Sequence, residues 1–552
     1  MASVDAPVRT GGEAVVQELL RHGLSTLFTL PGVQSDALFN ALYDRRDEVR
    51  VIHTRHEQGA GYMALGSALA TGQPAVCSIV PGPGVLNAGA ALATAHALNA
   101  PVLFLCSQIP LSQIGRGTGA LHEIPDQLAI LRQLTRFAAR ISHPSEVPQI
   151  LGSAIRALTA GRPGPAAVEI PMDVLAQSAP VLEAPVSGSA DLQYGPGSAS
   201  AGPPLDHAAL GRLADVLAGA KAPMIFVGSG AQGVAKEVRA LAELLDAPVV
   251  SYRTGRGIAD SRSHRSFVQP GARVLWQTSD VVLSLGSTMR VPLQGWERVA
   301  GQQLLRIDVD PASHALLRKP QVALTARLEE ALPVLLALLA DDVRLRAPRP
   351  SRREELVAAK SDWERRARVL EPQISWLEVI RDCLGEDGIL LDELCQVGFA
   401  SRLVYPVYHP RTFLSTGYMG TLGWGFPTAL GVKAACPDRR VVSIVGDGGF
   451  LFAASELATA VQHRIPLVTV LFNNNQYGNV QQMQRSLYGG RVIASDLVNP
   501  DFVQLARAYG ARGERVESPA ALGPVLDTAL AAKHPTLIEI PVGDMPSVDQ
   551  FR

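Results

Sequence analysis

The segment VSIVGDGGF, residues 442–450, decides the fold of this chain. A run of aliphatic residues, typical of a strand buried on both faces of a parallel sheet, stops abruptly at Gly446-Asp447-Gly448-Gly449. Glycine and aspartate are also the commonest residues of tight turns. The tetrapeptide alone therefore fits a plain turn as well as a ligand-binding loop, and the residues that follow must decide.

A helix and a second strand follow this segment. Residues 451–464, LFAASELATAVQHR, carry apolar side chains at roughly helical spacing from a start near Phe450, and Pro466 ends the helix. LVTVLF then forms a strand that runs into Asn473-Asn474-Asn475. Because a right-handed crossover makes the two strands parallel, Asp447 and Asn474 should meet in the crevice at their carboxyl ends, where α/β sheets bind ligands.

The chemistry expected in this crevice is that of a phosphate and a hard cation. The helix N-terminus favours a phosphate, and the glycines let the backbone approach it closely. Mg²⁺ takes oxygen ligands, so the Asp447 carboxylate, the Asn474 amide oxygen and the backbone carbonyl of Gln476 are the predicted metal ligands, with diphosphate and water completing the octahedron. The cofactor-binding candidates at this edge are Gly446, Asp447, Gly448, Gly449, Asn474, Gln476, Tyr477 and Gly478.

Short β-branched runs alternate with helical stretches along the rest of the chain, as in PAVCSIVPGPG, PVLFLCSQIP, PMIFVGSG and PTLIEIPV. This alternation predicts α/β domains with parallel sheets. A Pro-, Gly- and Ser-rich stretch is expected to be a linker, and a charged stretch a connecting helix. We therefore predict a first domain at residues 1–180, a linker at 181–204, a central domain at 205–340, a charged connector at 341–369 and a last domain at 370–552.

Bulk composition argues for a small-molecule substrate. Fifty basic and fifty-one acidic residues leave a formal charge of −1, so we expect no nucleic-acid partner and no membrane partner. Five scattered cysteines fit a reducing compartment, and the N-terminus lacks the pattern of a targeting peptide, so a cytoplasmic location is expected. The most apolar window, Val85 to Cys106, is interrupted by polar residues and proline and predicts a buried helix and strand.

GDGGF followed at this spacing by NNNQYG resembles the cofactor motif of thiamine diphosphate enzymes. The resemblance to acetohydroxyacid (acetolactate) synthases and their relatives, such as benzoylformate decarboxylase, covers essentially the whole chain. It includes, in order, RHEQGAGYMALG, VPGPGVLNA, GRPGPAAVEIPMDV, RIDVDPA and TGYMGTLGWGFPTALG. It implies three doubly wound parallel-sheet domains, which are a pyrimidine-binding domain, a central nucleotide-binding-like domain and a diphosphate-binding domain. It also implies thiamine diphosphate and Mg²⁺ as cofactors and a homodimer as the minimum unit, with a homotetramer common among relatives.

The resemblance assigns roles to residues around the cofactor. Glu57 matches the glutamate that hydrogen-bonds the pyrimidine ring. Gly82 and Asn87 would form a loop on the pyrimidine side. Leu422 would be the wedge beneath the bent cofactor, and the Gly420 carbonyl would accept from its 4′-amino group.

Further matches bear on the diphosphate and the substrate. DELCQVG stands where relatives have a DVGQH pattern, so contact with the diphosphate would rest on the backbone and on Gln396. Gln34, Gln108 and His122 match substrate-facing positions, and with Glu57 they are the catalytic candidates. Imidazole titrates near neutrality, so His122 could move protons during the reaction.

One segment favours a different class, an NAD- or FAD-dependent oxidoreductase. FVGSGAQGVAKE contains a GxGxxG pattern between a strand and a helix. The acid that should hold a ribose is absent, because Asp246 precedes the next strand and does not follow it. Flavin-binding relatives have an ARFDDR segment where this chain has GSTMRVP, with Arg290 shifted, and they have lysine and tryptophan where this chain has Met172 and Met483. FAD is therefore a disfavoured cofactor.

The resemblance implies a lyase or carboligase that depends on thiamine diphosphate and Mg²⁺ and acts on a 2-keto acid. Decarboxylation would be followed by protonation or by carboligation to a second carbonyl, as in acetolactate synthases. Alternatives are a decarboxylase of aromatic or branched 2-keto acids that releases an aldehyde, an FAD-dependent keto-acid oxidase, and a non-catalytic regulatory relative. The sequence leaves donor, acceptor and stereochemistry open.

Overall fold

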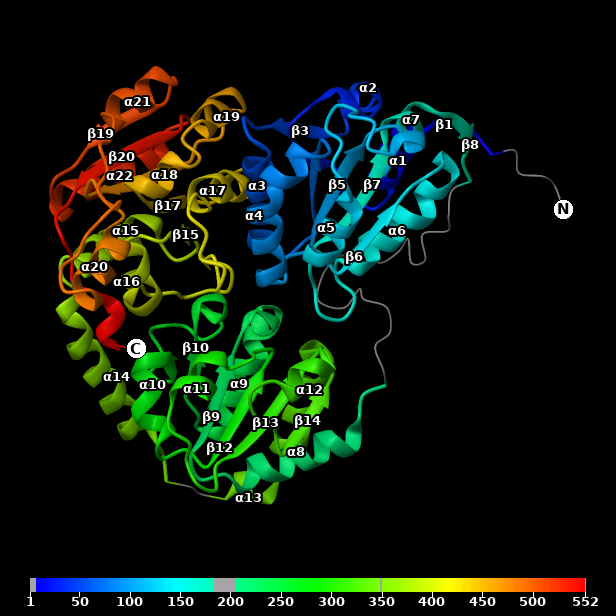
Figure 1. Ribbon diagram of the computed structural model, residues 1–552. Coiled ribbons are helices and arrows are strands. Elements are labelled where there is room, and N and C mark those ends of the chain that lie inside the picture. The colour runs from blue at the N-terminus through cyan, green and yellow to red at the C-terminus, as the bar shows by residue number, and fades with distance from the viewer. Residues whose placement is uncertain (1–5, 183–203, 348–349, 552) are drawn as a thin grey trace.

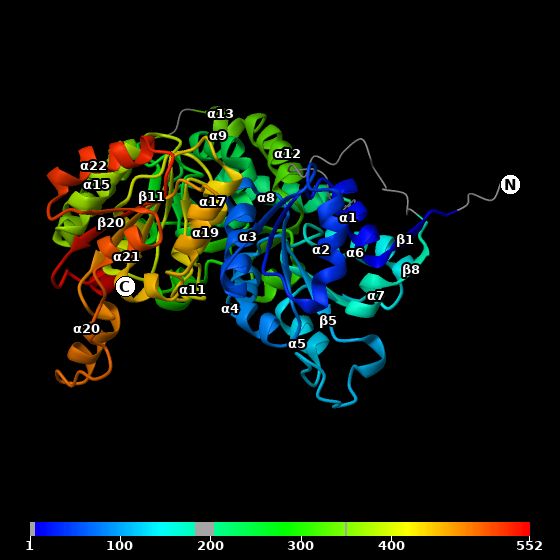
Figure 2. The same ribbon diagram turned by 90° about the horizontal axis from the view of Figure 1, so that it is seen from above.

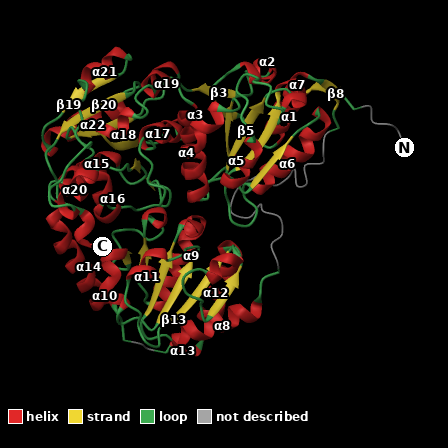
Figure 3. Ribbon diagram, viewed as in Figure 1, coloured by secondary structure: helices red, strands yellow, loops and turns green. Residues whose placement is uncertain are grey.

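The computed structural model describes residues 6–182, 204–347 and 350–551. Within these residues the chain forms three six-stranded parallel sheets, each flanked by helices on both faces, which confirms the predicted fold class (Figures 1 and 3). The predicted linker at 181–204 lies almost entirely outside the described residues. None of the described helices combines the length and apolar character needed to cross a membrane.

The first sheet has the strand order β3 (Arg50–His53), β2 (Thr26–Thr29), β4 (Ala75–Ile79), β5 (Val102–Gln108), β7 (Ala166–Pro171), β6 (Phe137–Arg140). Its three central strands, β4, β5 and β7, are buried throughout and rich in aliphatic residues, as parallel strands covered on both faces must be. One face packs against α1 (Gly11–Arg21), α2 (Asp36–Asp44) and α6 (Val147–Ala157). The other packs against α3 (Glu57–Thr71), α4 (Pro83–Leu98) and α5 (Gln127–Leu134). A small antiparallel pair, β1 (Val8–Thr10) with β8 (Ser178–Pro180), was not predicted.

The central sheet has the order β11 (Ser266–Val268), β10 (Val249–Ser251), β9 (Pro223–Val227), β12 (Val281–Leu285), β13 (Gln303–Asp308), β14 (Val322–Thr325). Helices α8 (His207–Gly219), α9 (Ala235–Leu245) and α12 (Leu328–Ala340) bury their apolar side chains on one face. On the other face α10 (Gln269–Trp276) packs together with α14 (Arg353–Ala367). The segment predicted as a charged connector thus includes α13 (Val343–Arg346) and a helix that covers the central sheet.

The third sheet has the order β16 (Phe413–Leu414), β15 (Ile389–Leu391), β17 (Val441–Gly446), β18 (Val468–Asn473), β20 (Thr536–Pro541), β19 (Arg512–Arg515). Its faces are covered by α15 (Gln373–Leu384), α16 (Gln396–Val404) and α22 (Pro519–Ala531), and by α17 (Gly425–Ala435) and α21 (Phe502–Ala508). A further helix, α20 (Gly478–Leu487), projects from the body of this domain (Figure 2).

The helix expected after GDGGF is two short helices, α18 (Asp447–Leu451) and α19 (Glu456–Gln462). Between them the backbone N–H groups of Phe452 and Ala453 bond to carbonyls three residues back, which interrupts the α-helical pattern. The first helix begins at Asp447 itself, three residues before the predicted start at Phe450. The carboxylate therefore lies at the helix N-terminus.

The first and third domains share one hydrophobic core, in which α3 crosses α17 (Figure 1). Two glycines permit this close crossing. A Cβ atom on Gly66 would lie 2.0 Å from the Thr428 carbonyl oxygen, and one on Gly431 would lie 1.9 Å from the Met63 carbonyl oxygen. The crossing holds the domain that contains Glu57 against the domain that contains Asp447.

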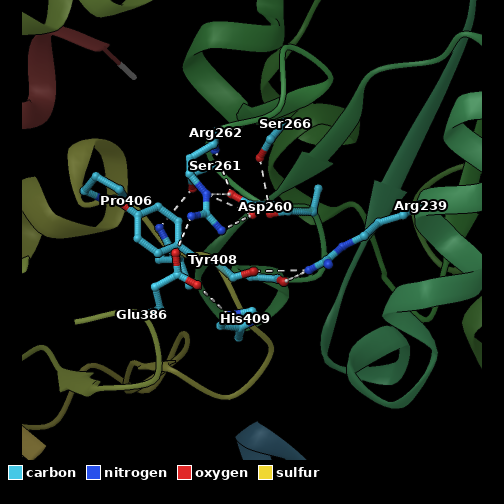
Figure 4. Close-up of polar contacts among 12 residues, drawn as sticks. Arg239, Asp260, Ser261, Arg262, Ser266, Glu386, Pro406, Tyr408 and His409 are labelled. Atoms are coloured by element: carbon cyan, nitrogen blue, oxygen red, sulfur yellow. Dashed lines mark hydrogen bonds and ion pairs between the residues drawn. The ribbon is translucent and has the colours of Figure 1, made fainter. Parts of the chain in front are cut away.

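The central and third domains meet through a polar cluster (Figure 4). The Arg262 guanidinium lies 4.3 Å from the centre of the Tyr408 ring and bonds to both Asp260 and Glu386. Arg239 donates a hydrogen bond of 3.2 Å to the backbone carbonyl of Tyr408. These contacts anchor the central domain to loops of the third domain.

Candidate active site

A cavity of about 270 Å³ opens at the carboxyl edge of the third sheet, next to the starts of α16, α18 and α20. All the residues predicted on the diphosphate side line it, and they come from four separate segments of the chain. They are Gln396, Gly420, Leu422, Gly446, Asp447, Gly448, Gly449, Asn474, Gln476, Tyr477 and Gly478. The parallel pairing of Gly446 with Phe472 brings the two motifs together, as the strand–helix–strand pattern predicts.

Asp447 is the buried carboxylate of this cavity. Burial raises the pKa of its carboxyl group, and a hydrogen bond of 2.7 Å from the Asn499 amide opposes that rise. A divalent cation beside the carboxylate would stabilise its charged form, so Asp447 is well suited to be a metal ligand. Asn499 also donates to Asn473 over 3.0 Å and was not predicted from the sequence. Among the described residues no three His, Cys, Asp or Glu side chains form a metal cluster, so the predicted set relies on one carboxylate and on amide and carbonyl oxygens.

Small residues keep the floor of the cavity open. A Cβ atom on Gly448 would lie 2.5 Å from Cε1 of Tyr477, and one on Gly478 would lie 2.7 Å from Nδ2 of Asn474. A Cβ atom on Gly446 would lie 3.0 Å from Cβ of Cys395. The backbone can therefore approach a bound anion closely, which fits a diphosphate.

The DELCQVG segment forms part of the cavity wall at the start of α16. The sulfur of Cys395 caps this helix by accepting the N–H of Gly398 over 3.3 Å, and the Gln396 amide donates to the Met545 carbonyl over 3.3 Å. Burial raises the pKa of Cys395 to about 12, so this thiol is neutral. The Gln476 side chain donates to Asp544 over 2.8 Å, which leaves its backbone carbonyl as the candidate ligand.

Glu393 supports the loop that carries Gly420 and Leu422, which we call the wedge loop. The Glu393 carboxyl accepts the Gly423 N–H over 2.7 Å, and it also packs against Gly449, where a Cβ atom would lie 2.8 Å from it. Full burial raises the pKa of Glu393 to about 8, so the group carries a proton at neutral pH. This residue links the wedge loop to the GDGG segment, and the sequence did not reveal it.

A second group of predicted residues gathers at the edge of the first sheet. Glu57 begins α3, is 8% exposed, and accepts a hydrogen bond of 3.0 Å from the side chain of Asn87. Gly82 is the N-cap of α4 and Asn87 lies within that helix, so the expected loop is the beginning of a helix. Asn87 and Glu57 thus form one polar unit built by two helix starts.

Gln34 and His122 join this group. The Gln34 amide donates to the Leu121 carbonyl over 3.0 Å, and His122 adopts a left-handed φ of 71° next to Gly82, where a Cβ atom would lie 2.3 Å from the His122 carbonyl oxygen. Both Gln34 Oε1 and His122 Nδ1 are buried and have no hydrogen-bond partner among the described residues. Two buried polar atoms without partners, one of them on a residue with a left-handed backbone, are typical of a ligand-binding site.

Gln108 lies in a different environment from these residues. Its amide nitrogen donates to Glu169 over 3.2 Å, and its oxygen accepts the N–H of Ile109 over 2.8 Å. Glu169 is fully buried and also binds Gln127, which in turn accepts the Gly82 N–H over 2.9 Å. The structure therefore places Gln108 in a network that supports the Gly82 turn, and both ends of its amide are engaged.

The two groups do not share a cavity within one chain. The residues that line the cavity at the third sheet do not include Glu57, Gly82, Asn87, Gln34 or His122.

The glycines of the GxGxxG segment in the central domain are explained by close packing. A Cβ atom on Gly230 would lie 2.9 Å from Cα of Gly286. Asp246 binds Arg265 over 2.9 Å at the end of α9, ahead of β10.

Comparison with known proteins agrees with this geometry. The chain matches the models of the thiamine pyrophosphate enzyme N-terminal binding domain at residues 9–130, central domain at 210–335 and C-terminal binding domain at 395–540. It is 35% identical to a probable 2-ketoarginine decarboxylase of Pseudomonas aeruginosa, over 91% of this chain and 88% of that protein. It is 31% identical to a probable acetolactate synthase large subunit of Methanocaldococcus jannaschii, over 96% and 91%. The chain therefore belongs to the thiamine pyrophosphate enzymes, among acetolactate synthase-like relatives.

Proposed function

We propose that this enzyme uses thiamine diphosphate with Mg²⁺ to decarboxylate a 2-keto acid, and then protonates the product or joins it to a second carbonyl compound. The observation that carries the proposal is the single cavity in which all the predicted diphosphate-side residues meet around the buried Asp447. In this proposal Asp447, the Asn474 side chain and the Gln476 carbonyl hold Mg²⁺. The starts of α16 and α18 and the glycine floor receive the diphosphate.

When bound, thiamine diphosphate supplies the nucleophilic carbon and the electron sink for the loss of CO₂. Glu57, which accepts a hydrogen bond from Asn87, would bind the pyrimidine ring, and Leu422 would pack against the cofactor from the cavity wall. His122 and Gln34 offer their unpartnered atoms to the substrate carboxylate or carbonyl. His122 is the proton carrier, because its buried imidazole nitrogen Nδ1 has no partner among the described residues and imidazole can both donate and accept a proton.

The site requires a second copy of the chain in this proposal. The Glu57 group does not line the cavity of its own chain. Large apolar side chains are exposed near both, with Leu86 on α4 at 55% and Phe452 after α18 at 56%. A homodimer would cover these side chains and bring the Glu57 group of one copy to the cavity of the other. A tetramer would be a pair of such dimers.

A panel of 2-keto acids that includes pyruvate and 2-ketoarginine, assayed for CO₂ release with and without an acceptor aldehyde, tests the reaction. An acyloin or a 2-hydroxy-3-keto acid among the products supports carboligation. Aldehyde alone supports the second candidate, a decarboxylase, which the 35% identity to a probable 2-ketoarginine decarboxylase favours. No CO₂ from any member refutes the proposal, and a flavin absorbance band in the purified protein would support the oxidase alternative.

A further inference from the structure

A carboxylate from the third domain holds the turn that precedes Glu57. Glu456 begins α19, nine residues after Asp447 in the chain, and reaches across the domain boundary. Its Oε1 accepts the backbone N–H of Arg55 over 3.1 Å and that of His56 over 3.0 Å. Its Oε2 lies 3.1 Å from the Arg55 N–H and accepts the Thr459 hydroxyl over 2.5 Å. Figures 1 and 2 both show α19 beside the start of α3.

The first helix is shaped to admit this carboxylate. Glu456 is only 1% exposed, and a Cβ atom on Gly59 would lie 2.5 Å from its Oε1. A side chain at position 59 would therefore displace the carboxylate from the two N–H groups. Burial also raises the pKa of Glu456, and hydrogen bonds from Thr459, Arg55 and His56 counter that rise. A buried carboxylate is destabilising without such donors, so Glu456 must keep its hydrogen bonds to the Arg55 and His56 N–H groups.

The contact of Glu456 with Arg55 and His56 lies directly before Glu57 in the chain. His56 is the N-cap of α3, and Glu57 is the first residue of that helix. The backbone turn at residues 55 and 56 therefore sets the direction in which the Glu57 side chain leaves the helix. An acid that must meet a ring nitrogen is sensitive to such placement, since a shift of about 1 Å can cost on the order of 10²-fold in rate.

We propose that Glu456 is a positioning residue, which clamps the turn at Arg55 and His56 and thereby sets Glu57 for its hydrogen bond to the pyrimidine ring. The inference rests on the proposed function for the role of Glu57. It goes further because it ties the segment that begins at Asp447 to the acid on the first domain. The same short stretch of chain then organises the diphosphate side of its own cavity and the acid of the pyrimidine side.

Hydrogen–deuterium exchange on the cofactor-free protein tests the clamp directly. In Glu456→Ala the amides of Arg55 and His56 should exchange at least tenfold faster than in the wild type, and Glu456→Gln, which keeps one acceptor oxygen, should recover most of that protection. Asp280→Asn is the matched control, because Asp280 accepts the consecutive N–H groups of Lys221 and Ala222 over 2.7 and 2.9 Å in the central domain. This control should leave the exchange at residues 55 and 56 unchanged.

A double-mutant cycle tests the action through Glu57. Glu456→Ala should lower kcat by at least tenfold and weaken the calorimetric affinity for thiamine diphosphate less than it lowers kcat. Added to Glu57→Gln, it should lower kcat by no more than about twofold further, because residues that act as one unit are not additive. Unchanged exchange in both Glu456 variants, or losses that multiply in the cycle, overturn the inference. Failure of the proposed function would show separately, as a wild type that binds no thiamine diphosphate.

Discussion

The hydroxyl of Tyr62 on α3 donates a hydrogen bond of 2.9 Å to the hydroxyl of Thr421, which lies between Gly420 and Leu422 in the wedge loop. The Thr94 hydroxyl on α4 lies 3.3 Å from the same oxygen. Two helices of the first domain therefore hold the loop that lines the cavity of the third domain. The helix that begins at Glu57 thus also supports the wedge of its own chain.

Tyr62→Phe should weaken this support without opening a cavity. Loss of one buried hydrogen bond should lower the free energy of unfolding by about 0.5–1.5 kcal/mol in urea titrations. Because the loop at Thr421 then loses a partner, the affinity for thiamine diphosphate should fall as well. An unchanged affinity together with the expected loss of stability would show that the loop does not depend on Tyr62.

Glu57→Gln should remove the acid while keeping the shape of the site. Turnover should fall by on the order of 10²–10⁴-fold, the range of general acid–base contributions, while the folded structure persists. Steady-state CO₂ release measures the effect. Glu243→Gln, at an exposed position on α9, is the control and should retain full activity. Full activity in Glu57→Gln would exclude the proposed role of this residue.

The third-domain half of the site could be predicted because it depends on local patterns. The hydrophobic runs that end at Asp447 and Asn474 define two parallel strands, and parallel strands place their ends at one edge. The break between α18 and α19 could not be predicted, since the apolar spacing continues through it. Only the three-residue hydrogen bonds of the structure reveal the interruption.

The supporting residues were missed because their partners are distant in sequence. Glu456 contacts Arg55 across 401 positions, Asn499 contacts Asp447 across 52, and Gln127 contacts Gly82 across 45. Each is an ordinary polar residue when it is read alone. Gln108 is the opposite case, a residue predicted to face the substrate. The sequence match does not reveal that Glu169 and Ile109 bind both ends of its amide.

Gly448→Ala tests the open floor of the cavity. The added methyl group would meet Tyr477 at 2.5 Å and Leu497 at 3.1 Å, so we expect a loss of about 1–3 kcal/mol of stability and a weaker affinity for thiamine diphosphate. Gly211→Ala on α8 is the control, because its Cβ atom meets nothing within 4 Å. That substitution should raise the free energy of unfolding by about 0.4–1 kcal/mol. Equal effects of the two substitutions would argue against a tight floor.

Glu393 should make stability depend on pH. Folding raises the pKa of this acid to about 8, so the folded chain keeps a proton that the unfolded chain releases above its ordinary pKa. The stability that this group contributes is present below the unfolded pKa and is lost as pH rises toward 8, at up to roughly 1.4 kcal/mol per pH unit. Glu393→Gln should flatten this dependence in urea titrations between pH 5 and 8. Parallel curves for the two proteins would contradict the assignment.

The central claim is that Asp447 and Asn474 hold a divalent cation that binds the diphosphate of thiamine diphosphate. Isothermal titration of thiamine diphosphate into the protein with Mg²⁺ tests it most directly. We expect saturable heat with one site per chain, no saturable heat once chelator has removed the metal, and no saturable heat for Asp447→Ala. Absence of heat with the wild type and Mg²⁺, or equal affinity with and without the cation, would contradict the account.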